Sequence, residues 1–285
     1  MGSIFDEGCA PCSALQKEEP ACPERTATDW FRLLTEAVAE FLGTLMFTVF
    51  GSLAVDAAYG NGIALTVVVF CTLTVSGGRL NPCVSFAICV AKLYAGDGHA
   101  TTSLLHALAE TIVQVAGAFV GALVARALAT GVACPSCCFA PPPGVPNAVV
   151  FGHEAMGTFL LVTTVLAVAV DRTGHEYNHR SQFMVVAPLA VGFALYVAAN
   201  AAGPYTGGAM NPARLMGSVV AGCHATWGSV GAYVGGEYVG AVGAILMHIA
   251  RDEVRTVYEK HNSAIIAAQG GACEKKGVVW SMKLH

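Results

Sequence analysis

A short motif occurs twice in this chain, and each copy lies among long apolar segments. The first copy ends in Asn-Pro-Cys at residues 81–83, and the second ends in Asn-Pro-Ala at residues 211–213. In both copies a hydroxyl residue and two glycines precede the Asn-Pro pair at the same spacing. Asparagine caps helix N-termini and proline suits the first helical position, so each pair predicts a turn followed by a helix start. Two such starts inside a membrane indicate half-helices whose N-termini point at a shared centre, which is the construction of a selective pore.

The composition is typical of a chain embedded in lipid. Of the 285 residues, 55% are hydrophobic and 12% are charged, whereas soluble domains carry about 25% charged residues. The 32 glycines suit helices that pack closely in a bilayer. The net charge of -4 is too small to indicate a nucleic-acid partner. Residues 1–28 lack the apolar core of a signal peptide, so we expect the first apolar segment to insert itself.

Apolar runs of about 20 residues predict six membrane-spanning helices. Their approximate bounds are 33–55, 61–76, 105–128, 149–170, 183–202 and 228–250. Two further apolar stretches, at about 82–93 and 212–222, are too short to cross and predict re-entrant half-helices. The predicted fold class is therefore an all-α membrane protein with six transmembrane helices and two half-helices.

The two halves of the apolar region repeat each other. Glu40, with Gly43 and Thr44 behind it in the first span, is echoed by Glu154 with the same spacing in the fourth. Gln114 in the third span has a looser echo in Glu237 of the sixth. Three spans per half give the halves opposite topology, as in inverted-repeat transport proteins. The expected domains are a tail at 1–32, a channel domain at 33–250 with repeats at about 33–128 and 149–250, and a tail at 251–285.

Positive charges indicate the orientation of the spans. Lys and Arg gather before the first span, after the sixth, and in the loops that follow the second and fourth spans. The other loops carry almost none, apart from Arg126 at the edge of the third span and Arg214 inside the second motif. By the positive-inside rule, both tails face the cytosol. The host membrane, plasma or vacuolar, stays open.

The paired motifs, the arginine directly after the second, the paired glutamate segments and the six-span spacing resemble the aquaporins, or major intrinsic proteins. The likeness covers about residues 33–250. It implies an hourglass-shaped channel with a pore centre at Asn81, Pro82, Cys83, Asn211, Pro212 and Ala213. There, converging helix N-termini would repel cations, and the asparagine amides would donate to passing water and interrupt proton conduction. Cys83 replaces the family's usual alanine, either as a packed small residue or as a thiol that mercurials reach from the pore.

Counting outward from the motifs locates the outer constriction that resembles the family's aromatic/arginine filter. The counted residues are Asn61, Ala199, Gly208 and Arg214. A shift of one residue would place a neighbouring glycine at the first of these positions. Water-specific members carry aromatic and histidine side chains here, whereas this set has neither. The set is most similar to the tonoplast intrinsic proteins, and we expect a wider, more polar constriction in which Arg214 repels cations.

Other polar groups in the apolar segments have alternative interpretations. The resemblance makes Glu40 and Glu154 structural buttresses of the re-entrant loops, whereas a coupled transporter would use them as proton carriers. Glu237 has no obvious counterpart in the family. We expect Cys71, Cys89 and Cys223 to pack as small apolar residues. For Cys134, Cys137 and Cys138 in one non-cytosolic loop, a disulfide, a bridge between subunits and a free thiol all stay open.

The leading function is a passive channel for water, with glycerol, urea or ammonia as further candidate solutes. A proton- or ion-coupled secondary transporter and a closed-pore structural or adhesion protein are the alternatives. No enzyme activity, cofactor or metal site is predicted, since the single CxxC of the N-terminal tail lacks a second pair. The resemblance implies a homotetramer in a lipid bilayer.

Overall fold

The computed structural model describes residues 27–96, 100–129, 138–170 and 180–268. Within these ranges the chain forms eight α-helices, one π-helical turn and one 3-10 turn, and no strand. In chain order the elements are α1 (Ala27–Leu53), α2 (Ala57–Thr72), α3 (Pro82–Tyr94), α4 (Ala100–Leu128), α5 (Asn147–Val165), the π-turn Leu166–Val170, α7 (Arg180–Thr206), α8 (Pro212–Val220), the 3-10 turn His224–Ser229 and α9 (Val230–Ala268).

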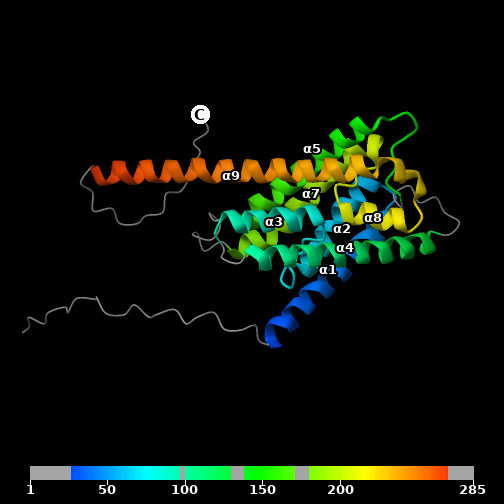
Figure 1. Ribbon diagram of the computed structural model, residues 1–285, viewed down its shortest axis with the longest axis horizontal. Helices are drawn as coiled ribbons and strands as arrows, with labels where there is room; N and C mark the ends of the chain where they lie inside the picture. The colour runs from blue at the N-terminus through cyan, green and yellow to red at the C-terminus, as the bar shows by residue number, and fades with distance from the viewer. Residues whose placement is uncertain (1–26, 97–99, 130–137, 171–179, 269–285) are drawn as a thin grey trace, which may run out of the picture.

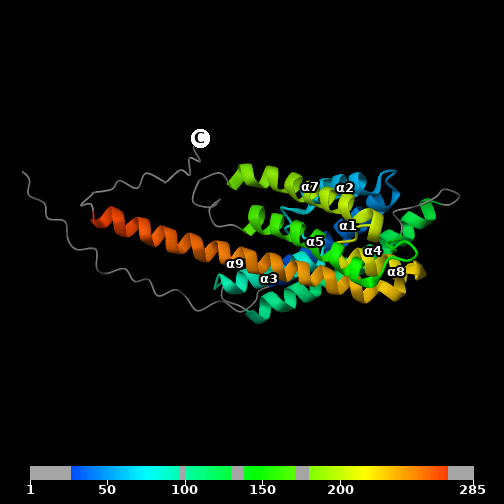
Figure 2. The same cartoon turned by 90° about the horizontal axis from the view of Figure 1, so that it is seen from above.

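The long helices lie side by side in one bundle (Figures 1 and 2). In the described part of the chain, five helices are long and apolar enough to cross a membrane, namely α1, α4, α5, α7 and α9. The remaining predicted span, the second at about 61–76, corresponds to α2, an apolar helix of 16 residues that packs against α1 and α7. The all-α membrane fold is therefore confirmed, with one span shorter than the others.

The last helix is longer than the sequence predicts. We expect the sixth span to end near residue 250, but α9 continues to Ala268 and extends beyond the rest of the bundle (Figure 1). Its extension has ion pairs along the helix, where Arg255 contacts Asp252 at 3.3 Å and Glu259 at 3.4 Å. Loss of apolarity marks where a helix leaves lipid, whereas the backbone stays helical while charged pairs support it.

The two short helices lie in the middle of the bundle, and each packs across to the opposite half. α3 from the first half contacts α9, and α8 from the second half contacts α4. The N-terminus of each is held near the other, because hydrogen bonds join the segments directly before them. The half-helices thus enter from opposite sides and meet at one point.

Two glycines allow close helix contacts at matching places in the bundle. A Cβ at Gly117 of α4 would overlap the carbonyl oxygen of Phe41 in α1. A Cβ at Gly240 of α9 would overlap the carbonyl oxygen of Ala155 in α5. The two pairs occupy matching places in the two repeats. Small residues at these positions let the backbones approach, as membrane helices require.

Candidate functional site

The two half-helices begin in the same way. Asn81 caps α3 by accepting from the backbone N–H of Cys83 at 2.9 Å. Asn211 caps α8 by accepting from the N–H of Ala213 at 3.0 Å and of Arg214 at 3.3 Å. Proline occupies the first position of both helices. Each side-chain oxygen therefore serves its own helix, which leaves the amide nitrogen for another partner.

The amide nitrogens of the two asparagines bond across the centre of the molecule. Asn81 Nδ2 donates to the carbonyl of Met210 at 2.7 Å, and Asn211 Nδ2 donates to the carbonyl of Leu80 at 2.8 Å. Leu80 and Met210 have positive φ angles of 53° and 43°, a region that non-glycine residues seldom occupy. One N–H of each amide is used in this exchange, so one N–H per asparagine is left for a molecule in the pore.

Glu40 of α1 holds the loop that precedes α3. Its carboxylate is fully buried and accepts from the backbone N–H groups of Arg79 at 3.1 Å and Leu80 at 2.7 Å. Ser76 and Gln114 also donate to it, at 2.5 Å and 2.8 Å. These donors give a buried carboxylate partners for both oxygens, which is the condition under which such a group is tolerated.

Two glutamates hold the equivalent loop before α8. Glu154 of α5 accepts from the N–H groups of Ala209 at 3.1 Å and Met210 at 2.7 Å. Glu237 of α9 accepts from the N–H of Asn211 at 2.8 Å, and its second oxygen has no partner. The structure thus gives Glu237 a contact that the sequence did not indicate. Its counterpart Gln114 donates instead, to Glu40 and to Ser85.

The four residues counted for the constriction are all buried and form two contacting pairs. Arg214 Nη1 donates to Asn61 Oδ1 at 2.5 Å, and Asn61 Nδ2 donates to the carbonyl of Ala57 at 2.7 Å. A Cβ at Gly208 would lie 2.9 Å from Cα of Ala199. Part of the space left by the two smallest residues is therefore taken up by their own contact. Nε and Nη2 of Arg214 have no partner within the described residues.

Two aromatic rings that the counting missed lie against the guanidinium of Arg214. The ring of Phe47 in α1 is 4.3 Å from it, and the ring of Phe139, in the segment before α5, is 5.1 Å from it. Both rings are buried. The counted set itself contains no aromatic residue, so these two rings are an addition from the structure. Phe47 follows Glu40 by two helical turns, and that spacing places it on the same face of α1; no local pattern marks Phe139.

A cavity of about 40 Å³, large enough to hold water, is lined by both asparagines. Its lining includes Phe47 beside Arg214 and reaches Arg79 in the loop before α3. Most of its walls are apolar side chains of α2, α5 and α7: Leu65, Val69, Leu161, Val165, Val191 and Leu195. Cys83 does not line it; its thiol is fully buried in the apolar core. Apolar walls with few polar groups offer a water molecule few hydrogen bonds.

Arg79 lines one side of this cavity, and an acidic residue of α4 holds its guanidinium. It forms an ion pair with Glu110 of α4, whose carboxylate is 3.7 Å from Nδ1 of His106. Nε2 of His106 in turn lies 2.9 Å from Glu36 of α1. This chain of contacts fixes Arg79 to the wall of the cavity and couples the loop before α3 to two long helices.

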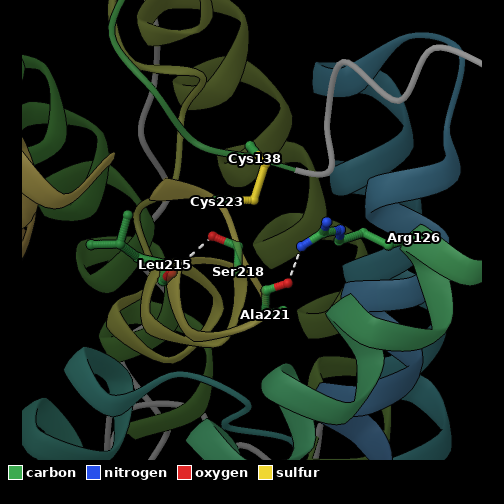
Figure 3. The surroundings of a disulfide bond; sticks show 6 residues. All are labelled: Arg126, Cys138, Leu215, Ser218, Ala221 and Cys223. Atoms are coloured by element: carbon green, nitrogen blue, oxygen red, sulfur yellow. Dashed lines mark hydrogen bonds between the residues drawn. A yellow bond between two sulfur atoms is a disulfide. The ribbon is translucent and has the colours of Figure 1, made fainter. Parts of the chain in front are cut away.

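A disulfide joins Cys138 to Cys223 (Figure 3). The expectation that Cys223 packs as a small apolar residue with a free thiol is therefore wrong: it lies three residues after the end of α8 and is bonded to the segment after α4. Cys134 and Cys137 lie outside the described residues. The arginine at the edge of the third span also contacts this region, because Arg126 Nη1 donates to the carbonyl of Ala221 at the end of α8 (Figure 3). A cation suits a helix C-terminus.

Within the ranges described, no cluster of three or more His, Cys, Asp or Glu side chains could hold a metal ion. The fold and this site define a helical membrane channel built as an inverted repeat. The sequence profile of the family described as "Major intrinsic protein" matches residues 28–248. The chain belongs to this family, whose members include the aquaporins.

Similar proteins agree with this assignment. The chain is 32% identical over 234 residues to "Aquaporin PIP-type" of Atriplex canescens, covering 74% of this chain and 78% of that protein. It is 35% identical over 228 residues to "Aquaporin TIP2-2" of Zea mays, covering 72% and 84%. The X-ray structure of the aquaglyceroporin from Plasmodium falciparum has the same fold, with a TM-score of 0.61 at 21% identity, covering 78% of this chain and 96% of that one. The protein is a passive membrane channel for water and small solutes.

Proposed function

We propose that water crosses in single file past Asn81 and Asn211, and that Arg214, Asn61, Ala199 and Gly208 form the selectivity filter beside this path. The observation that carries the proposal is the reciprocal bonding of the two asparagine amides to Met210 and Leu80. It fixes both amides at one level of the cavity and leaves one N–H on each. Two fixed donors at one point of an apolar tube suit a small neutral molecule that accepts hydrogen bonds.

The same geometry supports the exclusion of protons and ions. A water molecule between the asparagines accepts hydrogen bonds from both amides, so its own hydrogens point away from the centre along the file. Protons cannot then pass along one continuous chain of similarly oriented waters. The N-termini of α3 and α8 add partial positive charge at this level, and Arg214 adds a full charge at the filter. Cations are repelled at both places.

We infer that neutral solutes larger than water, namely glycerol and urea, pass more slowly than water, whereas ammonia, which is close to water in size, stays a further candidate solute. The minimal side chains of Ala199 and Gly208 favour their passage. The two rings against Arg214 and its bond to Asn61 oppose it, because they fill the surroundings of the guanidinium. Residue 215 is leucine, whereas glycerol facilitators usually have aspartate directly after the arginine. The balance favours water as the main substrate.

A coupled transporter is the less favoured alternative. A proton carrier needs a carboxylate that reaches the path of the solute. Glu40 and Glu154 accept hydrogen bonds from backbone N–H groups, and neither lines the cavity. These contacts support a buttress role for both residues. We therefore propose no proton coupling and, because the family consists of channels, no catalysis and no cofactor.

We further propose a homotetramer with one pore per subunit and both termini in the cytosol. Large apolar side chains on the outer faces of α1 and α2 are exposed in the single subunit and suit contact with lipid or with a neighbouring subunit: Leu42, Phe50, Ile63 and Val67. Residues 33–250 form the channel domain in this proposal. The polar tails 1–32 and 251–285 flank it, and the second begins with the extension of α9.

Stopped-flow measurement of the volume change of proteoliposomes tests the proposal. Purified protein is reconstituted, and shrinkage is followed in sorbitol, glycerol and urea gradients, with ammonia uptake read by an internal pH dye. We expect fast water flux, slower solute flux, and no dependence on an imposed pH gradient. Flux that follows the pH gradient would instead support the coupled transporter. A volume change no faster than that of protein-free vesicles would support the closed-pore alternative.

A further inference from the structure

Phe139 contacts the arginine of the proposed filter although it belongs to none of the helices that form the filter. Its ring is buried and lies 5.1 Å from the guanidinium of Arg214. It also packs against the loop before α8, because a Cβ at Gly207 would lie 3.6 Å from Cα of Phe139. Together with Phe47 of α1, Phe139 leaves the guanidinium of Arg214 little freedom to move.

A covalent bond holds the segment that carries this ring. Cys138 directly precedes Phe139, and its disulfide partner Cys223 follows α8, the helix that carries Arg214 (Figure 3). Arg126 donates to the carbonyl of Ala221 at the same end of α8. Ring and arginine are therefore tied to one another through a single S–S bond rather than only through packing. The two cysteines are 85 residues apart in the chain.

We call the Cys138–Cys223 disulfide the tether. It is attached beside α8, the half-helix that carries Arg214 of the proposed filter. The residue of α3 that matches Arg214 is Val84. Valine is uncharged, so the first half-helix has no guanidinium that needs to be positioned. α3 is also longer, with 13 residues against nine for α8. A nine-residue helix has few hydrogen bonds of its own, so its orientation depends on what fixes its two ends.

We propose that the Cys138–Cys223 disulfide is a specificity-determining element of the filter, which positions Phe139 over Arg214 and so restricts solutes larger than water. The inference rests on the proposed filter. A phosphine reductant breaks the tether: two electrons pass from phosphorus to the S–S bond, the two sulfurs take up two protons, and water supplies the oxygen of the phosphine oxide. The released segment lets Phe139 and the guanidinium separate, and glycerol then passes more easily relative to water.

The test uses full-length protein purified without reductant and reconstituted in vesicles. Glycerol and water permeabilities are measured by stopped flow before and after a phosphine reductant is added on both sides. Alkylation followed by peptide mass spectrometry reports whether the thiols of Cys138 and Cys223 have been released. The double variant Cys138→Ser/Cys223→Ser lacks the tether permanently. Cys71→Ser is the matched control, because Cys71 is a free, exposed cysteine far from this site in the chain.

We expect the ratio of glycerol to water permeability to rise by roughly threefold or more on reduction, the scale of a lost cation–π contact. The double serine variant should show the raised ratio without reductant and no further response, and Cys71→Ser should behave as the unmodified protein does. If the double variant does not fold, the reduction of the unmodified protein decides the matter by itself.

An unchanged ratio after complete reduction would overturn the inference, as would alkylation of both thiols before reductant is added. A reductant response that persists in the double variant would also overturn it. These outcomes leave water flux through the channel intact. Failure of the proposed function is distinct, because it would appear as water flux no faster than in protein-free vesicles.

Discussion

The backbone N–H of Asn211 donates to the buried carboxylate of Glu237 at 2.8 Å. The first repeat supports its asparagine loop differently, because Gln114 occupies the equivalent position and donates to Glu40 and Ser85. The two asparagine loops are thus similar in backbone and unlike in their supports. The second loop is held by two carboxylates, and the first by one carboxylate and an amide.

This relationship predicts an order among variants of Glu237. Glu237→Gln keeps an oxygen that accepts from Asn211, so we expect water permeability close to that of the unmodified channel. Glu237→Ala leaves a buried N–H without a partner, at a cost of about 1–3 kcal/mol in the free energy of unfolding, and should lower water flux. Thermal unfolding in detergent and stopped-flow swelling measure the two effects. Equal behaviour of the glutamine and alanine variants would contradict the importance of the hydrogen bond.

Asn211→Asp should lower water flux and relax the exclusion of cations. An ionised aspartate cannot donate to the carbonyl of Leu80, and it places negative charge where the N-termini of α3 and α8 converge. Water flux by swelling and cation leak by a potential-sensitive dye check both parts. Asn81→Asp changes the matching residue of the first repeat and should act in the same direction. A variant with normal water flux and no leak would refute the central role given to these amides.

Two glycines of α9 make a matched pair for the packing of the bundle. Gly240→Ala forces a methyl group into the backbone of α5, and we expect a loss of about 1–3 kcal/mol in stability. Gly231→Ala meets nothing within 4 Å and should be neutral or stabilising by up to about 1 kcal/mol. Thermal unfolding of both variants in the same detergent compares them. Equal stabilities of the two alanine variants would show that the α5–α9 contact does not depend on a glycine at residue 240.

Mercury inhibition should not depend on Cys83. The thiol is fully buried in the core and does not line the cavity, so a mercurial in the pore has no direct access to it. We expect Cys83→Ala to leave any inhibition by mercuric chloride unchanged. The measurement is stopped-flow swelling with and without mercury. Inhibition that disappears in the alanine variant would place the thiol on the water path.

Much of the fold could be predicted because it depends on local patterns. Apolar runs gave the positions of the long helices, and the Asn-Pro pairs gave the first residues of α3 and α8. The end of α9 could not be found in this way, since an apolar run reports contact with lipid and not the end of a helix. The contacts of Arg214 could not be predicted from the sequence either. Phe47 and Phe139 contact it from segments far away in the chain, and no local spacing relates them to Arg214.

The sequence by itself determined the class of protein, because a duplicated helix start between apolar segments permits few arrangements in lipid. Counting from the two motifs also selected the four residues of the proposed constriction. Only the tertiary structure decided how those residues are held. The bond between Arg214 and Asn61, the two rings on the guanidinium and the disulfide behind them join parts of the chain that meet only after folding. The exchange of amide bonds between Asn81 and Asn211 is of the same kind, since each asparagine finds its partner in the opposite repeat.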